Sequence, residues 1–193
     1  LVHNLVVDHQ QRVAYSALRI GQVYGLTNAE QADLTYASSL HDIGLLTVEE
    51  KLKALEYDIQ DGSKHAALGS ILLGHFHLFD RVSQLVRYHH KPWNSEKNWD
   101  GIDPKVRVMS NIINLADRLD VIIDKSVGIL KQREELQKRL GGLANTVFNP
   151  ELLECLFKAG ESESFWLDLT SPRIYSVLLD SIVWPRVQLS LGD

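Results

Sequence analysis

His41 and Asp42 stand side by side after an apolar stretch and just before Gly44. Neutral imidazole and carboxylate together suit a divalent metal such as iron, manganese or zinc. A lone pair of this kind also fits a solvated helix end, so the pair by itself does not decide the matter. Companions are present, because four further histidines fall at or near the ends of expected helices: His9, His65, His89 and His90.

These positions predict a shared site. His9 and His65 lie near expected helix starts, whereas His41 and the His89-His90 pair lie at expected helix ends. Helices packed side by side bring such ends together at one end of a bundle, where metal sites are commonly built. Two acids lie within an otherwise apolar helix and should not be buried unless they bind a metal or a cation. These acids, Asp117 and Asp120, either join the site or pair with Arg118 or with a basic residue on another helix.

The elements that must position these residues are predicted to be helices. Apolar residues recur at helical spacing, and capping boxes at Thr27–Glu30 and Thr47–Glu50 mark two helix starts. Ser63, Asp103-Pro104, Asn149-Pro150 and Ser171-Pro172 mark four more. Residues 56–62 and 91–103 are expected to be loops. The predicted class is all-α, with helices over residues 9–24, 28–41, 47–55, 63–73, 79–88, 104–123, 131–140, 150–158 and 172–184.

Composition narrows the class of protein. The chain has 193 residues, of which 45% are hydrophobic, and this is enough for one core. The net charge of −5 argues against binding a DNA or RNA polymer. No apolar run approaches the roughly 20 residues of a membrane span, and no signal peptide is visible. The single cysteine, Cys155, fits a reducing compartment, so we expect a cytoplasmic protein. The chain begins at Leu1 rather than Met, and we expect a sensor or receiver domain fused ahead of it.

Several short motifs follow one another in a recognisable order. They are His9-Gln10-Gln11-Arg12-Val13, His41-Asp42-Ile43-Gly44, His65 followed by Ile71-Leu72-Leu73, Arg87-Tyr88-His89-His90-Lys91-Pro92-Trp93, Ala116-Asp117-Arg118-Leu119-Asp120 and Phe148-Asn149-Pro150-Glu151. This order resembles the HD superfamily of metal-dependent phosphohydrolases, specifically its HD-GYP branch. The resemblance implies a helical HD domain over residues 1–160. Residues 161–193 would then form a helical extension that packs on the bundle or on a second copy.

The resemblance also implies a site with two divalent metals, iron or manganese. His9, His41, Asp42 and Asp117 would hold one metal, and His65, His89 and His90 the other. Asp42 would take the catalytic role of a carboxylate that bridges both metals and positions a nucleophilic hydroxide. In such sites the metals lie about 3.5–4 Å apart and stabilise in-line attack on phosphorus.

The chain departs from the branch at three points. Leu45 stands where a lysine is frequent, and Leu5 stands where some members carry a glutamate that holds a third metal. The naming Gly-Tyr-Pro tripeptide is replaced by the sequence after Trp93. A two-metal site is therefore expected, and a three-metal site is not. Lys91 and Arg118 either contact substrate phosphate or are solvated. Trp93 and Trp99 either stack on a base or anchor their loop.

The expected function is that of a two-metal phosphodiesterase acting on a cyclic dinucleotide such as cyclic di-GMP. One alternative is a catalytically weak signalling module that binds a nucleotide or a partner protein. Another is an HD phosphohydrolase of a different phosphate ester. A homodimer is expected to be compatible with any of these functions.

Overall fold

The computed structural model describes residues 2–47, 49–50, 52, 62–95 and 99–184, with side chains from Asp8 onward. The described elements are α-helices and one short 3-10 helix, which confirms the all-α prediction. The expected helix over 47–55 and the loop over 56–62 lie largely outside the described residues. The bounds of the described helices are α1 Val2–Tyr24, α2 Asn28–Leu40, α4 Gly62–Leu73, η1 His77–Phe79, α5 Asp80–Tyr88, α6 Pro104–Ile122, α7 Ile129–Gly141, α8 Pro150–Ala159, α9 Glu163–Leu169 and α10 Ile174–Asp180.

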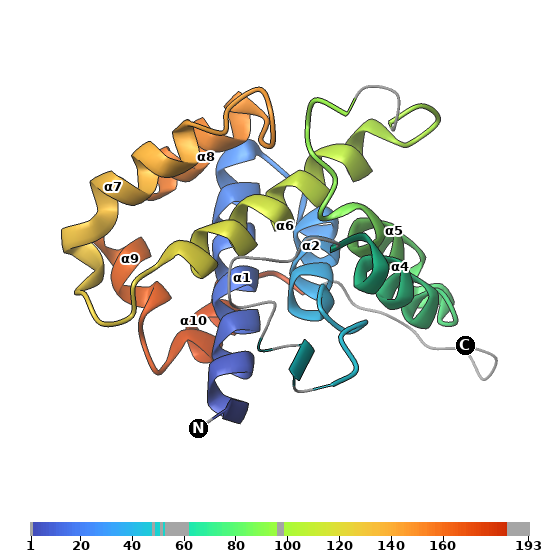
Figure 1. Cartoon of the computed structure of the whole chain (residues 1–193), viewed down its shortest axis with the longest axis horizontal. Coiled ribbons are helices and arrows are strands. Elements are labelled where there is room, and N and C mark those ends of the chain that lie inside the picture. The colour runs from blue at the N-terminus through green and yellow to red at the C-terminus, as the bar shows by residue number, and fades with distance from the viewer. Residues whose placement is uncertain (1, 48, 51, 53–61, 96–98, 185–193) are drawn as a thin grey trace.

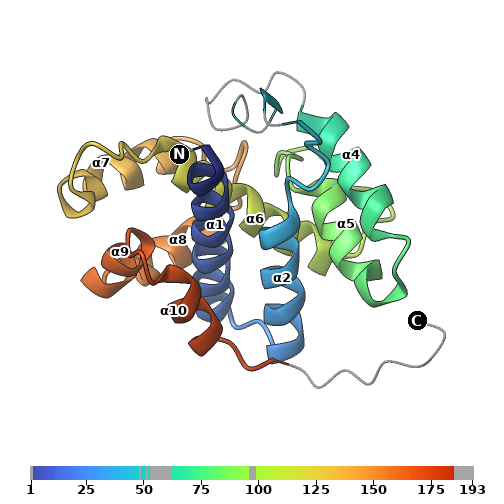
Figure 2. The same ribbon diagram turned by 90° about the horizontal axis from the view of Figure 1, so that it is seen from below.

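Helix α1 forms the centre of the fold. Its apolar residues Val13, Ala17 and Leu18 are fully buried, because α2, α6 and α8 all pack around it. Figures 1 and 2 show α4 and α5 on the α2 side of this axis and α7 to α10 on the other side. Within the described chain, no helix is both long and apolar enough to cross a membrane.

Helix α1 begins earlier than the sequence indicated. The prediction started it at His9, whereas the helix runs from Val2. His9 therefore lies inside α1 and not near its start, which corrects the expected position. The error arises because Val2, Leu5 and Val6 already continue the helical pattern, and the prediction did not extend to them. Ser63 was also placed wrongly as a cap, because α4 already begins at Gly62.

The helices α4 and α5 form an antiparallel pair, and α5 packs against α2 and α6. Val82, Leu85 and Val86 of α5 are buried, as their spacing predicted. The hydroxyl of Ser110 on α6 donates to the Leu85 carbonyl at 3.1 Å, which ties α6 to α5. This packing places the ends of α2 and α5 beside the first turn of α4.

The helices α9 and α10 pack on the bundle through α1. Phe165 stacks on Tyr15 with ring centroids 5.8 Å apart, and the Tyr15 hydroxyl donates to Asp168 at 3.1 Å. The helix predicted over 172–184 is present but shorter, since α10 covers only Ile174–Asp180. The Ser171 hydroxyl accepts from the Arg173 amide, which makes a turn before the helix. At the end of the helix the Ser181 hydroxyl donates to the Val177 carbonyl.

The described parts of the loop over 91–103 are not helical, as predicted. Trp99 is buried, and its indole N–H donates to the Pro92 carbonyl at 3.2 Å. The Arg107 guanidinium of α6 lies 3.8 Å from the Trp93 ring centroid. Both tryptophans therefore anchor the loop, which was one of the two predicted roles.

Helix α2 begins with a complete capping box, and this start yields a stability prediction. The Thr27 hydroxyl accepts from the Glu30 amide, and the Glu30 carboxylate accepts from the Thr27 amide at 2.9 Å. We expect Thr27→Ala to lower the free energy of unfolding by about 1 kcal/mol. Urea denaturation followed by circular dichroism measures this. Thr170→Ala is the control, because that exposed hydroxyl makes only long contacts of 3.3 and 3.4 Å, and an equal loss in both variants would contradict the prediction.

Candidate metal centre

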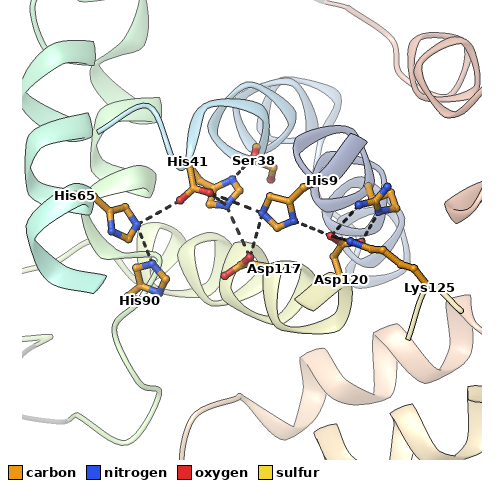
Figure 3. Close-up of polar contacts among 10 residues, drawn as sticks. His9, Ser38, His41, His65, His90, Asp117, Asp120 and Lys125 are labelled. Carbon is orange, nitrogen blue, oxygen red and sulfur yellow. Dashed lines mark hydrogen bonds and ion pairs between the residues drawn. The ribbon is translucent and has the colours of Figure 1, made fainter. Parts of the chain in front are cut away.

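The structure brings the seven predicted site residues to one place in the bundle, although they come from five segments. His9 projects from the middle of α1, and His41 and His89 are the C-terminal caps of α2 and α5. His65 lies in the first turn of α4, and Asp117 lies on α6. Figure 3 shows the labelled side chains converging between these helices. The remaining two members, Asp42 and His90, directly follow the two caps.

The seven residues form two adjoining groups. In the first group, nitrogen or oxygen atoms of His9, His41 and Asp42 all lie within 4.8 Å of one another. The second group has the same compactness and consists of His65, His89 and His90. Both groups contain the ligand types that divalent transition metals prefer. The first group includes a carboxylate, whereas the second is built from imidazoles alone.

Asp42 lies between the two groups. Its Oδ2 atom is 3.2 Å from His41 Nε2 and 3.7 Å from His9 Nε2. Its Oδ1 atom is 3.4 Å from His65 Nε2, in the second group. One carboxylate thus directs one oxygen to each group, the geometry that a bridging ligand requires.

Asp117 completes the first group from the α6 side. Its Oδ1 atom lies 3.4 Å from His9 Nε2 and 3.8 Å from His41 Nε2. The Asp117 side chain is half-buried. The basic partner that we expected for a buried acid is found at Asp120 and not at Asp117. Asp120 is 1% exposed and pairs with Arg12 of α1, one of the alternatives that the sequence left open.

Backbone carbonyls set the orientation of two imidazoles. The Nδ1 atoms of His41 and His89 each lie 2.7 Å from a carbonyl three residues earlier, that of Ser38 and that of Val86. A carbonyl only accepts, so Nδ1 carries the hydrogen in both rings and the neutral ring has its lone pair on Nε2. Both Nε2 atoms are buried, and neither forms a hydrogen bond within the described structure. Buried Nε2 atoms held in this orientation suit a cation, which at His41 takes the place of a proton.

Burial and the neighbouring charges separate the two groups electrostatically. Burial lowers the pKa of His41, but the carboxylates of Asp42 and Asp117 outweigh this and raise the pKa to about 9. Burial raises the pKa of Asp42, yet His41 and the other imidazoles hold that pKa well below its usual range. Burial lowers the pKa of His90 to about 4 and that of His89 far below its usual value. His89 and His90 are therefore neutral, and a cation in the first group displaces a proton from His41.

Gly44 brings the two groups together. A Cβ atom built on Gly44 would lie 2.1 Å from the His65 carbonyl oxygen and 2.7 Å from the Gly69 amide nitrogen. The turn after Asp42 therefore lies directly on the α4 backbone, and only glycine permits that distance. This contact places the Asp42 carboxylate beside His65.

The family described as the HD domain matches residues 6–122, which is more than half of the chain and includes all seven residues. The chain belongs to the HD domain family. This result confirms the resemblance found in the sequence.

The curated relatives of this HD domain chain are phosphodiesterases. It is 25% identical over 171 residues to 3'3'-cGAMP-specific phosphodiesterase 1 of Vibrio cholerae, covering 84% of this chain and 39% of the relative. It is 26% identical to 3'3'-cGAMP-specific phosphodiesterase 2 of the same organism, covering 78% and 30%. It is 21% identical to a cyclic di-GMP phosphodiesterase of Thermotoga maritima, covering 78% and 43%. The chain thus spans less than half the length of these relatives.

A solved structure has the same fold. The crystal structure of a cyclic GMP-AMP specific phosphodiesterase from Vibrio cholerae superposes with a TM-score of 0.65 at 17% identity. The match covers 91% of this HD domain chain and 50% of the other. At this identity the likeness establishes the fold alone.

The sequence left open a pair between Asp120 and a basic residue on another helix, but it did not identify Arg12 as that residue or show the contact of Asp120 with His9. Arg12 follows His9 by three residues in α1, and Asp120 follows Asp117 by three in α6, so each lies on the face of its helix that bears the ligand. That spacing was the available signal. Lys91, a predicted phosphate contact, has its Nζ atom 4.7 Å from the Tyr88 ring centroid and 4.9 Å from that of Trp99. Its role, like that of half-buried Arg118, stays a prediction.

Proposed function

We propose that this chain is a metal-dependent phosphodiesterase that hydrolyses a cyclic dinucleotide at the two adjoining groups. The observation that supports it most is Asp42, whose two oxygens face different groups, 3.2 Å from His41 and 3.4 Å from His65. Two divalent ions, iron or manganese, fit this arrangement. They would be held by His9, His41, Asp42 and Asp117 on one side and by His65, His89 and His90 on the other.

The carboxylates and the imidazoles of the site have different roles in this proposal. Two divalent ions, when bound, supply Lewis-acid charge for the phosphoryl oxygens and lower the pKa of water. The neutral imidazoles of His89 and His90 offer nitrogen lone pairs without adding charge. Asp42 and Asp117 supply negative charge on the side of the site that faces α1 and α6. Burial of these side chains excludes bulk water from them and strengthens their electrostatic interactions.

The names of the relatives support the substrate class. Two are called 3'3'-cGAMP-specific and one is called a cyclic di-GMP phosphodiesterase. A small cyclic dinucleotide, with cyclic di-GMP as the first candidate, is therefore the proposed ligand. Lys91 and Arg118 remain the proposed contacts to its phosphates, since each directly follows a ligand residue. A homodimer, a fused sensor or receiver domain and a cytoplasmic location remain predictions.

The test is an assay of the purified chain with defined metals. We expect about two ions per chain after loading with Mn²⁺ or, without oxygen, Fe²⁺. The loaded protein should hydrolyse cyclic di-GMP or 3'3'-cGAMP, and protein stripped with EDTA should not. Bis(p-nitrophenyl) phosphate serves as a general phosphodiester. Confirmed metal binding without turnover of any of the three would refute the proposal.

Leu45 favours a second candidate, a weakly catalytic signalling module. Its side chain is 8% exposed and apolar, so it gives the substrate no positive charge at a position where the branch frequently has lysine. Such a module would bind a nucleotide or a partner protein without turning it over. Calorimetry with cyclic di-GMP distinguishes the two functions, because binding without hydrolysis by metal-loaded protein would favour the module.

A further inference from the structure

We propose that Asp120, held by Arg12, is a positioning residue that fixes His9 for metal binding and acts on the first group only. The inference rests on the proposed two-metal site. It concerns metal affinity, which is measured separately from phosphodiester hydrolysis.

Both carboxylate oxygens of Asp120 make contacts with defined partners. Its Oδ2 atom lies 2.7 Å from His9 Nδ1, across 111 residues of sequence. The Arg12 guanidinium donates from Nε to Oδ1 and from a terminal nitrogen to Oδ2 at 3.2 Å. Lys125 Nζ lies 3.9 Å from Oδ2, and Figure 3 shows it approaching from the side opposite His9.

This pairing determines which nitrogen of His9 faces the metal group. A guanidinium stays protonated, so the carboxylate paired with it remains an acceptor. His9 must then carry hydrogen on Nδ1. Its Nε2 atom, 3.4 Å from Asp117 and 3.7 Å from Asp42, is left to act as a ligand. A carboxylate behind a ligating histidine also fixes the orientation of the ring.

The support behind His9 differs from that behind the caps of α2 and α5. His41 and His89 are oriented by the neutral carbonyls of Ser38 and Val86. His9 is the ring for which the described contacts show an ionised carboxylate at Nδ1. Among the described residues, the first group therefore carries a charged support that the second group does not share, and loss of that charge should weaken the first group alone.

An asparagine at position 120 cannot reproduce these contacts. Both carboxylate oxygens already accept, one from Arg12 and the other from Arg12 and His9. An amide nitrogen turned toward Arg12 meets another donor. Turned toward His9, it would favour hydrogen on Nε2, the nitrogen that the metal needs. Either orientation loses at least one of the three contacts while the side-chain volume is kept.

The experiment measures Mn²⁺ affinity by calorimetry in backgrounds that isolate each group. His65→Ala disables the second group, and His41→Ala disables the first. We expect Asp120→Asn to weaken Mn²⁺ binding about 10- to 100-fold in the His65→Ala background. It should leave the affinity unchanged in the His41→Ala background. Asp124→Asn is the control, because Asp124 is exposed and its substitution removes the same negative charge.

Arg12→Lys is a second variant, which tests the inference if Asp120→Asn does not fold. Thermal unfolding of the metal-free protein shows whether each variant folds. Arg12→Lys keeps the charge but loses the two-pronged contact, so a smaller loss confined to the first group is expected. Unchanged affinity of the first group, or equal weakening of both groups, would overturn the inference. Wild-type protein that binds two Mn²⁺ ions without hydrolysing any phosphodiester would overturn the proposed function and leave this inference standing.

Discussion

Replacing Asp42 with asparagine is expected to lower the rate of cyclic dinucleotide hydrolysis by at least about a thousandfold, or roughly 4 kcal/mol in activation free energy. The size follows from the position of the carboxylate, which directs Oδ2 to His41 at 3.2 Å and Oδ1 to His65 at 3.4 Å. An amide keeps one oxygen, so it cannot supply an anionic contact to both groups. Metal content should fall with activity, and elemental analysis of the dialysed variant measures that loss.

The matched control for this prediction is Asp33→Asn. Asp33 also lies in α2, and its carboxylate is 3.9 Å from the partly exposed Arg81. The change of charge is the same, but the pair is remote from the metal groups and such surface pairs contribute at most about 1 kcal/mol. Asp33→Asn should therefore keep metal content and turnover. An Asp42→Asn protein that retained two ions and full turnover would refute the bridging role.

Local signals predicted the helices well because the hydrogen bonds that start them lie within four residues. Thr27 and Glu30 form the expected reciprocal box, and Asp103 and Asn149 cap helices that begin with proline. The same reasoning failed at Ser171, whose hydroxyl bonds to the Arg173 amide in a turn and not at the start of a helix. A serine before proline is compatible with both structures, so packing around it decides.

Local sequence patterns could not predict the two metal groups, because the groups form through contacts between residues far apart in the sequence. His9 meets Asp120 across 111 residues, and His65 meets His90 across 25. The order of motifs allowed the seven residues to be grouped, because a resemblance carries information about the fold that propensities lack. It did not indicate that Arg12 and Asp120 form a charged support for His9. That pair depends on how α1 crosses α6, which is set by the packing of the whole core.

Substituting alanine at Gly44 is expected to have the largest effect on folding among the predicted variants. The added Cβ would lie 2.1 Å from the His65 carbonyl oxygen, inside the van der Waals radii, and both partners are backbone. The turn and α4 must separate, and we expect the free energy of unfolding to fall by about 3 kcal/mol, the upper end of typical overpacking costs. Denaturant unfolding measures this loss.

The same separation moves Asp42 away from His65, so the Gly44→Ala protein should lose catalysis beyond its loss of stability. A displacement of about 1 Å costs about a hundredfold in rate, which folded protein assayed well below its melting temperature would reveal. Gly142→Ala is the control, since Gly142 directly follows α7 with φ −63° and the atom nearest to its added Cβ would be 3.5 Å away. Equal stability and turnover in the two variants would show that Gly44 does not set the distance between the groups.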